Sequence, residues 1–160
     1  MARIDIPEGP GGDPVMLWTL RPEMARMVDT MIATAYSKSK LPAAEREPAR
    51  MRIAQLNACD ACSTFRAPSV VDAGVDEALY EHVAEWATWP GYTERQRLAI
   101  EYAERYAVAH REIDDAFFDR MRQVFADDEI LDLTLCCAVF VGLGRTLEVL
   151  GVREHCDLDI

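Results

Sequence analysis

The sequence predicts an all-α fold, a single-domain bundle of about seven helices. Apolar residues recur at spacings of three and four along most of the chain, which is the period of a helix with one buried face. Capping residues precede several of these stretches, and Gly or Pro follows them. No stretch alternates apolar and polar residues as a half-buried strand does, and 160 residues suit one domain of ordinary size.

The chain is expected to begin with a flexible arm over residues 1–16. The helical domain then covers 17–152, and residues 153–160 form a C-terminal tail. The arm is predicted from its density of residues that interrupt regular structure. These are Pro7, Gly9, Pro10, Gly11, Gly12 and Pro14.

The first long helix is predicted from Pro22 to about Ser37, with Pro22 suited to a first turn. Lys38 to Pro42 follow it and end the helical pattern. An apolar stripe runs along this helix, and we expect its methionines to lie in the core. The stripe consists of Met24, Met27, Val28, Met31, Ile32 and Ala35.

A second helix is predicted from about Ala43 to Asn57. Glu45 and Glu47 lie in its opening turns, where the positive end of the helix dipole favours acidic side chains. Pro48 fits poorly, because a proline inside a helix costs about 3 kcal/mol. We therefore expect the regular helix to begin near Pro48.

Two short helices are expected next. One covers residues 61–73 and is ended by Gly74, with Pro68 kinking or shortening it. Asp76 caps the following helix, which carries Leu79, Val83 and Trp86 on one side.

Two further helices have clear start signals. Thr93 and Gln96 form a capping box, which predicts a helix over about 93–110. Asp114 is expected to cap another, over about 114–125.

The last long helix is predicted to begin at Asp127 or Asp128 and to be buried at the centre of the bundle. Its apolar run is interrupted by Gly142, Gly144 and Arg145, so we expect no membrane span, which needs about 20 residues. Its apolar residues lie nearly all round the helix. They are Ile130, Leu131, Leu133, Leu135, Val139, Phe140 and Leu147.

Charge and cysteine content limit the possible partners and compartment. Seventeen basic and 28 acidic residues give a net charge of -11, which repels nucleic acid and anionic lipid surfaces. The first residues lack the apolar segment of a secretory signal, so a cytoplasmic location is expected. Disulfides that only stabilise a fold are rare in that reducing compartment.

Cys59-Asp60-Ala61-Cys62 is the main candidate for chemistry. Buried cysteines often act as small apolar fillers. A zinc site needs about four ligands, and this motif supplies two, with no second motif of the kind elsewhere. A redox pair, in which one thiolate attacks and the other resolves the intermediate, is the third reading. With Asp60 as N-cap, Cys62 would lie in the first turn of a helix, where the dipole lowers the pKa of a thiol.

Several segments together resemble the carboxymuconolactone decarboxylase superfamily, in particular its alkylhydroperoxidase D-like branch. They are Glu47 followed after eleven residues by Cys59-x-x-Cys62, the helical hairpin that follows, TERQRLAIEYAERYA, and EILDLTLCCAVFVGLGRTLEVLGV. The resemblance covers residues 17–152. It implies an all-α fold, assembly into trimers or hexamers, and a thiol-dependent peroxidase or disulfide reductase with no metal or organic cofactor.

The resemblance also implies roles for single residues. Cys62 would meet a hydroperoxide or disulfide substrate, Cys59 would resolve the intermediate, and an unidentified thiol reductant would restore the pair. Glu47 would relay a proton through a His four residues after the second Cys. An unbroken helix would place Glu47 about 18 Å along its axis from Cys59, so their cooperation requires a chain reversal or a neighbouring subunit.

Arg66 occupies the position where the family pattern has that His. Arginine stays charged and cannot shuttle a proton. At i+4 on the same helix face, its guanidinium would stabilise a Cys62 thiolate or hold an anionic substrate. Alternatively, Arg66 is a solvated surface charge.

Three function classes follow. The leading one is a thiol oxidoreductase that acts through Cys62 and Cys59. The second is decarboxylation or lactone chemistry like that of the enzyme that gives the family its name, with Arg66 holding a carboxylate. The third is a non-catalytic oligomeric module in which the dithiol is inert.

Overall fold

The computed structural model describes residues 2–152, and within them it confirms the all-α class, since no strand occurs there. The long helices lie close to their predicted positions. The elements in chain order are α1 (Gly12–Met16), η1 (Leu17–Leu20), α2 (Pro22–Ser37), α3 (Ala43–Leu56), α4 (Asp60–Thr64), α5 (Pro68–Asp72), α6 (Ala78–Glu81), η2 (Val83–Glu85), α7 (Glu94–Val108), η3 (His110–Glu112), α8 (Asp115–Arg122) and α9 (Asp127–Leu150), where η marks a 3-10 helix.

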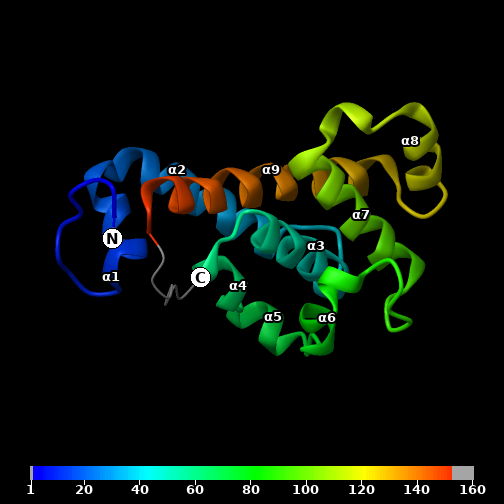
Figure 1. Cartoon of the computed structure of the whole chain (residues 1–160), viewed down its shortest axis with the longest axis horizontal. Coiled ribbons are helices and arrows are strands. Elements are labelled where there is room, and N and C mark those ends of the chain that lie inside the picture. The colour runs from blue at the N-terminus through cyan, green and yellow to red at the C-terminus, as the bar shows by residue number, and fades with distance from the viewer. Residues whose placement is uncertain (1, 153–160) are drawn as a thin grey trace.

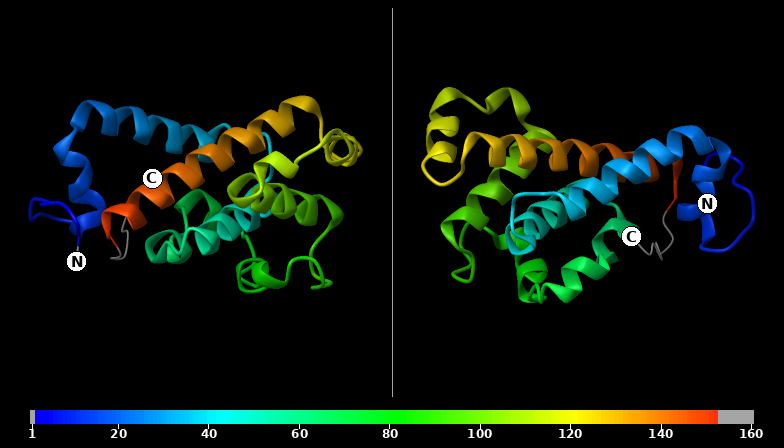
Figure 2. Two further views of the ribbon diagram at one scale, coloured as in Figure 1. Left: turned by 45° about the horizontal axis from the view of Figure 1, so that its top comes forward. Right: turned by 180° about the vertical axis from the view of Figure 1, so that it is seen from behind.

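Helix α9 runs along most of the molecule, with α1 near one end and α8 near the other (Figure 1). Helix α3 packs against both α7 and α9, and α2 lies along the other side of α9 (Figure 2). The short helices α4, α5 and α6 follow α3 and lie below it in the view of Figure 1. Helix α3 is therefore the central element that connects the bundle to the short helices.

The main apolar core lies between α3, α7, α8 and α9. Tyr102 of α7 stacks on Phe117 of α8 with ring centroids 6.1 Å apart, and its hydroxyl shares a 2.7 Å hydrogen bond with Thr134 of α9. The start signals for two of these helices are confirmed by the Thr93–Gln96 capping box and the Asp114 cap. The buried residues of this core are Leu41, Ala49, Ile53, Leu98, Ala99, Tyr102, Ala103, Phe117, Met121, Phe125, Ile130, Leu133 and Cys137.

Pro48 lies inside α3, which begins five residues earlier at Ala43, so the expectation that the helix starts near the proline is wrong. Pro48 has no N–H to donate to the carbonyl of Ala44. The side chain of Gln96 fills that place, because its amide donates to the Ala44 carbonyl at 2.9 Å while its oxygen completes the α7 capping box. A side chain from α7 thus compensates for the proline in α3.

The N-terminal segment is more structured than predicted. Residues 12–16 form α1, and Pro14 is fully buried, although residues up to 16 were expected to form an arm. The backbone N–H of Arg3 donates to the carbonyl of Leu150 at 2.7 Å, which connects the start of the chain to the end of α9. The predicted tail at 153–160 lies outside the described residues.

The methionine stripe of α2 does not face the core. The side chains of Met24, Met27 and Met31 are 59%, 74% and 48% exposed, so their assignment to the core is wrong. Helix α2 turns another side toward the protein, where Ala25 is buried and Ile32 and Tyr36 line a cavity. Periodicity locates an apolar face, but the tertiary arrangement decides what covers it.

Helix α9 is also only partly covered, because Leu131, Leu135 and Val149 are at least half exposed. The prediction of a fully buried central helix is therefore correct for one side of α9 and wrong for the other. By length and composition α9 is also apolar enough to cross a membrane, despite its glycines and Arg145. Three of its buried residues, Ile130, Leu133 and Cys137, pack in the core described above, as expected for a core helix.

Candidate functional site

A tight chain reversal at the end of α3 positions the cysteine pair. The N–H of Ala58 donates to the carbonyl of Gln55, and the N–H of Cys59 donates to that of Ala54, both at 3.0 Å. These two bonds form a Schellman motif, whose turning residue usually is a glycine in the left-handed region. Here it is Ala58, with φ 52°. The reversal brings α4 back alongside α3.

Cys59 also begins α4. Its Sγ accepts a hydrogen bond from the N–H of Cys62 at 3.2 Å, so Cys59 is the N-cap and the assignment of Asp60 to that position is wrong. Asp60 is instead the first helical residue. Cys59 and Cys62 are joined by a disulfide, with their Cα atoms 5.2 Å apart, within the usual range for such bonds. The structure therefore describes the oxidised state of the pair.

The two cysteines differ in access. Cys59 is 3% exposed, whereas Cys62 is half-buried and lines a cavity of about 110 Å³ between α2, α3, α4 and α9. An engineered cavity of about 150 Å³ holds a benzene ring, so a small organic group is the right size for this one. Apolar side chains make up most of its lining, among them Trp18, Ile32, Ile53, Phe65, Phe140 and Leu147.

Glu47 is fully buried beside two buried arginines of the same helix. Its Oε2 accepts a hydrogen bond from Nε of Arg50 at 2.8 Å, and its Oε1 lies 3.6 Å from Nε of Arg46. The hydroxyl of Tyr80 also donates to Oε2 at 3.3 Å. Burying a carboxylate is costly unless cations and hydrogen-bond donors surround it, and this cluster supplies both.

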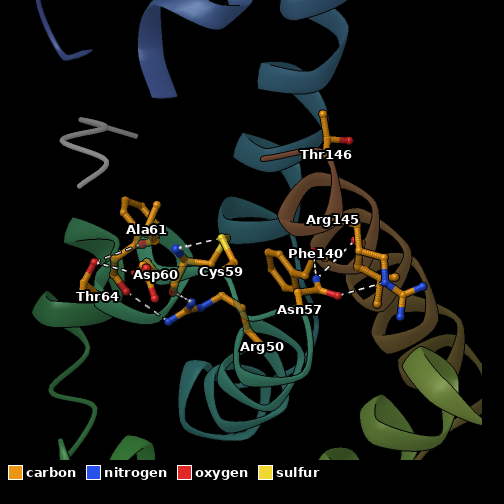
Figure 3. Close-up of a disulfide and its surroundings, with 12 residues drawn as sticks. Arg50, Asn57, Cys59, Asp60, Ala61, Thr64, Phe140, Arg145 and Thr146 are labelled. Carbon is orange, nitrogen blue, oxygen red and sulfur yellow. Dashed lines mark hydrogen bonds between the residues drawn. A yellow bond between two sulfur atoms is a disulfide. The ribbon is translucent and has the colours of Figure 1, made fainter. Parts of the chain in front are cut away.

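Arg50 connects this buried cluster to the cysteine helix. Its two Nη atoms donate to the carbonyls of Cys62 at 2.6 Å and Phe65 at 3.1 Å, while its Nε holds Glu47. Figure 3 shows Arg50 reaching from α3 toward the turn that carries Cys59. Burial acts to lower the pKa of Arg50, but the Glu47 carboxylate outweighs it and holds that pKa above its ordinary value.

The chain reversal thus brings the cysteines back toward Glu47, whereas an unbroken helix would keep them far apart. Glu47 reaches the Cys62 backbone through one side chain, Arg50. Sequence reasoning missed Arg50, although a signal was present. Arg50 follows Glu47 by three residues on a helix whose opening turns are rich in charge, and that spacing allows contact on one helix face.

Arg66 does not occupy the predicted position. Helix α4 ends at Thr64, and Phe65 has an extended backbone, so Arg66 does not share a helix face with Cys62. Its guanidinium forms two hydrogen bonds of 3.0 Å to Glu77 and lies 3.8 Å from the centroid of the Tyr80 ring. It also donates to the carbonyls of Ser63 and Phe65. Arg66 is therefore anchored between α4 and α6 and is not a solvated charge, and its guanidinium bonds to Glu77, Ser63 and Phe65 rather than to Cys62.

Asn57 fixes the other side of the reversal to α9 (Figure 3). Its amide donates to the carbonyls of Phe140 and Val141 at 3.3 Å, and its oxygen accepts from Nε of Arg145 at 3.0 Å. Gly144 permits this contact, because a Cβ at that position would lie 2.6 Å from the Asn57 amide nitrogen. The cysteine turn is thus held on one side by Arg50 and on the other by α9.

The remaining cysteines of the described chain lie apart from this pair. Cys136 and Cys137 are buried in α9, and burial raises the pKa of Cys136 to about 11 and that of Cys137 still further. Neither is therefore expected to be a reactive thiolate at neutral pH. In the part of the chain that the structure describes, no group of three or more His, Cys, Asp or Glu side chains is placed to hold a metal ion.

Several known proteins are similar to this chain. An uncharacterised protein of Escherichia coli, YnjA, is 28% identical over 148 residues, which are 92% of this chain and 77% of the relative. An uncharacterised protein of Mycobacterium tuberculosis is 32% identical over 117 residues, which are 66% of this chain and 40% of that longer protein.

Two crystal structures share the fold. An uncharacterised peroxidase-related protein from Ralstonia eutropha, described as an alkylhydroperoxidase AhpD core, superimposes with a TM-score of 0.76 at 21% identity. The match covers 90% of this chain and 77% of that one. A peroxidase-related protein from Silicibacter gives a TM-score of 0.78 at 20% identity, with 94% and 90% covered. These similarities support an AhpD-like helical fold.

The sequence profile of the carboxymuconolactone decarboxylase family matches residues 22–105. This match includes Glu47, Arg50 and both cysteines of the reversal, which are the residues that form the candidate site. The chain belongs to the carboxymuconolactone decarboxylase family.

Proposed function

We propose that the protein is a thiol-dependent oxidoreductase that reduces a hydroperoxide or disulfide with Cys62 and Cys59. The observation that carries the proposal is that Cys62 lines an apolar cavity while Cys59, its disulfide partner, lies buried behind it. A thiol with access to a cavity suits the attack, and a buried neighbour within bonding distance suits the resolving step.

A hydroperoxide would be reduced in three steps. The Cys62 thiolate attacks the terminal peroxide oxygen, the O–O bond breaks, and the organic fragment leaves as an alcohol after gaining a proton. Cys62 is then a sulfenic acid. The Cys59 thiol attacks its sulfur, water leaves, and the Cys59–Cys62 disulfide forms. A thiol reductant, expected in the cytoplasm, then returns both sulfurs to the reduced state.

Glu47 and Arg50 support this chemistry by position. We propose that Arg50 fixes the α4 backbone at the Cys62 and Phe65 carbonyls, and that Glu47 holds Arg50 in place. The direct proton relay that the family pattern assigns to Glu47 stays a prediction. The alternative decarboxylase reading gains no support from Arg66, whose guanidinium is paired with Glu77.

The test is a titration of the reduced protein with tert-butyl hydroperoxide, followed by mass-spectrometric mapping of each cysteine. We expect one equivalent to form the Cys59–Cys62 disulfide. Cys59→Ser should stop at a sulfenic acid on Cys62, and Cys62→Ser should not react. Cys136→Ala is the matched control and should behave like the unmodified protein. Equal peroxide consumption by Cys62→Ser would overturn the assignment of Cys62 as the attacking thiol. If the unmodified protein forms no Cys59–Cys62 disulfide with peroxide, the inert module is the better reading.

We also propose that the protein forms a homo-oligomer, a trimer or hexamer as the family resemblance implies. Met24, Met27 and Met31 follow one another at spacings of three and four residues, so they form one exposed apolar stripe on α2. Large exposed apolar patches mark interaction surfaces. Sedimentation should give a mass above that of one chain, and Met27→Glu should lower it. A monomer at micromolar concentration would count against this assembly.

A further inference from the structure

Tyr36 of α2 lines the same cavity as Cys62. No histidine lies in the described lining of that cavity, although a peroxide reduction needs a proton for the departing oxygen. Among the polar residues of the lining, Arg50 is already committed to Glu47 and two carbonyls, and Asp29 is exposed at α2. Tyr36 therefore is the lining residue to consider as a proton donor.

The Tyr36 ring is held in place from several sides. Its centroid lies 6.2 Å from that of Phe65 and 6.0 Å from that of Phe140, two other residues of the cavity wall. The guanidinium carbon of Arg46 lies 5.0 Å from the ring centroid, within the range of a cation–π contact. Such packing from three elements fixes the direction of the hydroxyl relative to the cavity.

The hydroxyl itself makes no side-chain or backbone hydrogen bond to the residues 2–152 that the structure describes, in contrast to Tyr80, Tyr92 and Tyr102. Those three hydroxyls bond to Glu47, the Leu79 carbonyl and Thr134 respectively. A half-buried hydroxyl without such a partner has its donor capacity available to a molecule in the cavity.

Electrostatics keep this hydroxyl protonated. Burial raises the pKa of Tyr36 above its ordinary value, and the nearby Glu47 carboxylate acts in the same direction, while Arg50 and Arg46 oppose them. A neutral phenol is still more acidic than the alcohol that the released alkoxide becomes. The proton transfer is therefore favourable at the moment when the O–O bond breaks.

We propose that the Tyr36 hydroxyl donates its proton to the departing alkoxide oxygen of a hydroperoxide bound against Cys62. The inference rests on the proposed peroxidase function and adds the group that replaces the missing histidine. The S–O bond forms as the O–O bond breaks. The alkoxide then takes the Tyr36 proton and leaves as an alcohol. The tyrosinate regains a proton from solvent before the next turnover.

The experiment compares two oxidants with different leaving groups on the reduced protein and its Tyr36→Phe variant. tert-Butyl hydroperoxide releases a basic alkoxide that needs a proton, whereas peracetic acid releases acetate, which leaves as a stable anion. Single-turnover rates are read by quenching and mass-spectrometric mapping of Cys62. Tyr106→Phe, a half-buried tyrosine of α7 outside the cavity lining, is the matched control.

Tyr36→Phe should slow oxidation by tert-butyl hydroperoxide by roughly 100-fold, the usual size of a lost general acid. Its reaction with peracetic acid, and alkylation of Cys62 by iodoacetamide, should stay within about twofold of the unmodified protein, since neither needs the donor. Tyr106→Phe should change none of the three rates.

Three other outcomes would contradict the role of Tyr36 as a proton donor. Equal slowing with both oxidants and with iodoacetamide would mean that Tyr36 shapes the site and donates no proton. No slowing with either oxidant would overturn the inference while leaving the peroxidase proposal intact. If the unmodified protein reacts with neither oxidant at Cys62, the proposed function fails and the inference fails with it.

Discussion

The buried residues of α3 are of two kinds, and the two kinds are held differently. Ala49 and Ile53 lie in the apolar core against α7 and α9, each 1% exposed. Arg46, Glu47 and Arg50, on the same helix, form a buried charged cluster with exposures of 4%, 0% and 4%. The apolar core can adjust to small changes of shape, whereas the charged cluster depends on every partner being present.

This difference indicates where function lies. Replacing a buried ion pair by apolar residues is often neutral or stabilising, so a buried charged cluster is weak evidence for stability. The charged cluster contacts the carbonyl of Cys62, whereas the apolar core between α3, α7, α8 and α9 contains no residue of the cysteine turn. We infer that the charged cluster positions the cysteine turn and that the apolar core maintains the bundle.

The largest expected effect comes from Glu47→Ala. Removing the carboxylate leaves two buried guanidinium groups without their counter-ion, which should lower the free energy of unfolding by about 3–5 kcal/mol. Ile130→Ala in the apolar core, near the start of α9, should cost about 2–5 kcal/mol through the cavity that it leaves. Urea unfolding of both variants measures these changes.

The charged cluster and the apolar core are distinguished by the rate of disulfide formation. Without denaturant, at a temperature where both variants are folded, Glu47→Ala should slow formation of the Cys59–Cys62 disulfide, because Arg50 is no longer held. The conservative Ile130→Val, in the apolar core and outside the cavity lining, should not slow it. If Ile130→Val slows disulfide formation as much as Glu47→Ala does, the division of roles between the charged cluster and the apolar core is wrong.

The sequence predicted the long helices because their signals are local. The Thr93–Gln96 box, the Asp114 cap and the 22–37 stripe depend on neighbours within four residues, and the helix that each of them predicts is confirmed. The methionines of α2 were placed wrongly for the same reason. Their periodicity is genuine, but which face of α2 meets α9 is decided by contacts far apart in the sequence.

The sequence singled out the two cysteines and Glu47 as candidate residues, but not the contacts that connect them. Arg50 resembled an ordinary exposed helix charge until the chain reversal at Ala58 brought the Cys62 carbonyl to it. Arg66 was misplaced because a helix ending at Thr64 was not recognised. Ala67 precedes Pro68, and a residue before proline favours the extended backbone seen there, which was the available signal.

Arg66→Ala should have the next largest effect, on stability alone. It removes the ion pair with Glu77 and the contact with the Tyr80 ring, which together should be worth about 1–2 kcal/mol. Because the guanidinium is anchored away from the pair, we expect the dependence of Cys62 alkylation rate on pH to stay unchanged. A slower alkylation at neutral pH would restore Arg66 as a thiolate stabiliser.

Ala58→Gly should produce a smaller effect of opposite sign. Ala58 is exposed and has φ 52°, a conformation that glycine adopts without the steric cost that alanine bears. Part of this gain is offset because glycine makes the unfolded chain more flexible, so we expect a net stabilisation of about 0.5–1 kcal/mol. Thermal unfolding checks it. Exposed Ala73→Gly, at the end of α5 with φ -73°, is the control and should not stabilise the protein.

The smallest expected effect concerns Glu101 on α7, far from the site. Burial acts to raise the pKa of this carboxyl, but Arg120 and Arg105 outweigh it and hold the pKa below its ordinary value. Glu101 accepts hydrogen bonds from Arg120 at 2.6 and 3.2 Å and pairs with Arg105 at 2.8 Å. Because both arginines are at least a third exposed, the pairs should be worth no more than about 1 kcal/mol.

The sign of the pH dependence follows from the lowered pKa. The stability that Glu101 contributes is fully present above the unfolded-state pKa of about 4.3 and is lost as the pH falls through the lower folded-state value. Glu101→Gln should therefore be less stable than the unmodified protein at pH 7, and the gap should close as the pH falls from about 5 toward 3. Urea midpoints at several pH values measure it. A gap that stays constant with pH would mean that Glu101 acts through packing. Its ion pairs with Arg105 and Arg120 would then contribute nothing to the free energy of unfolding.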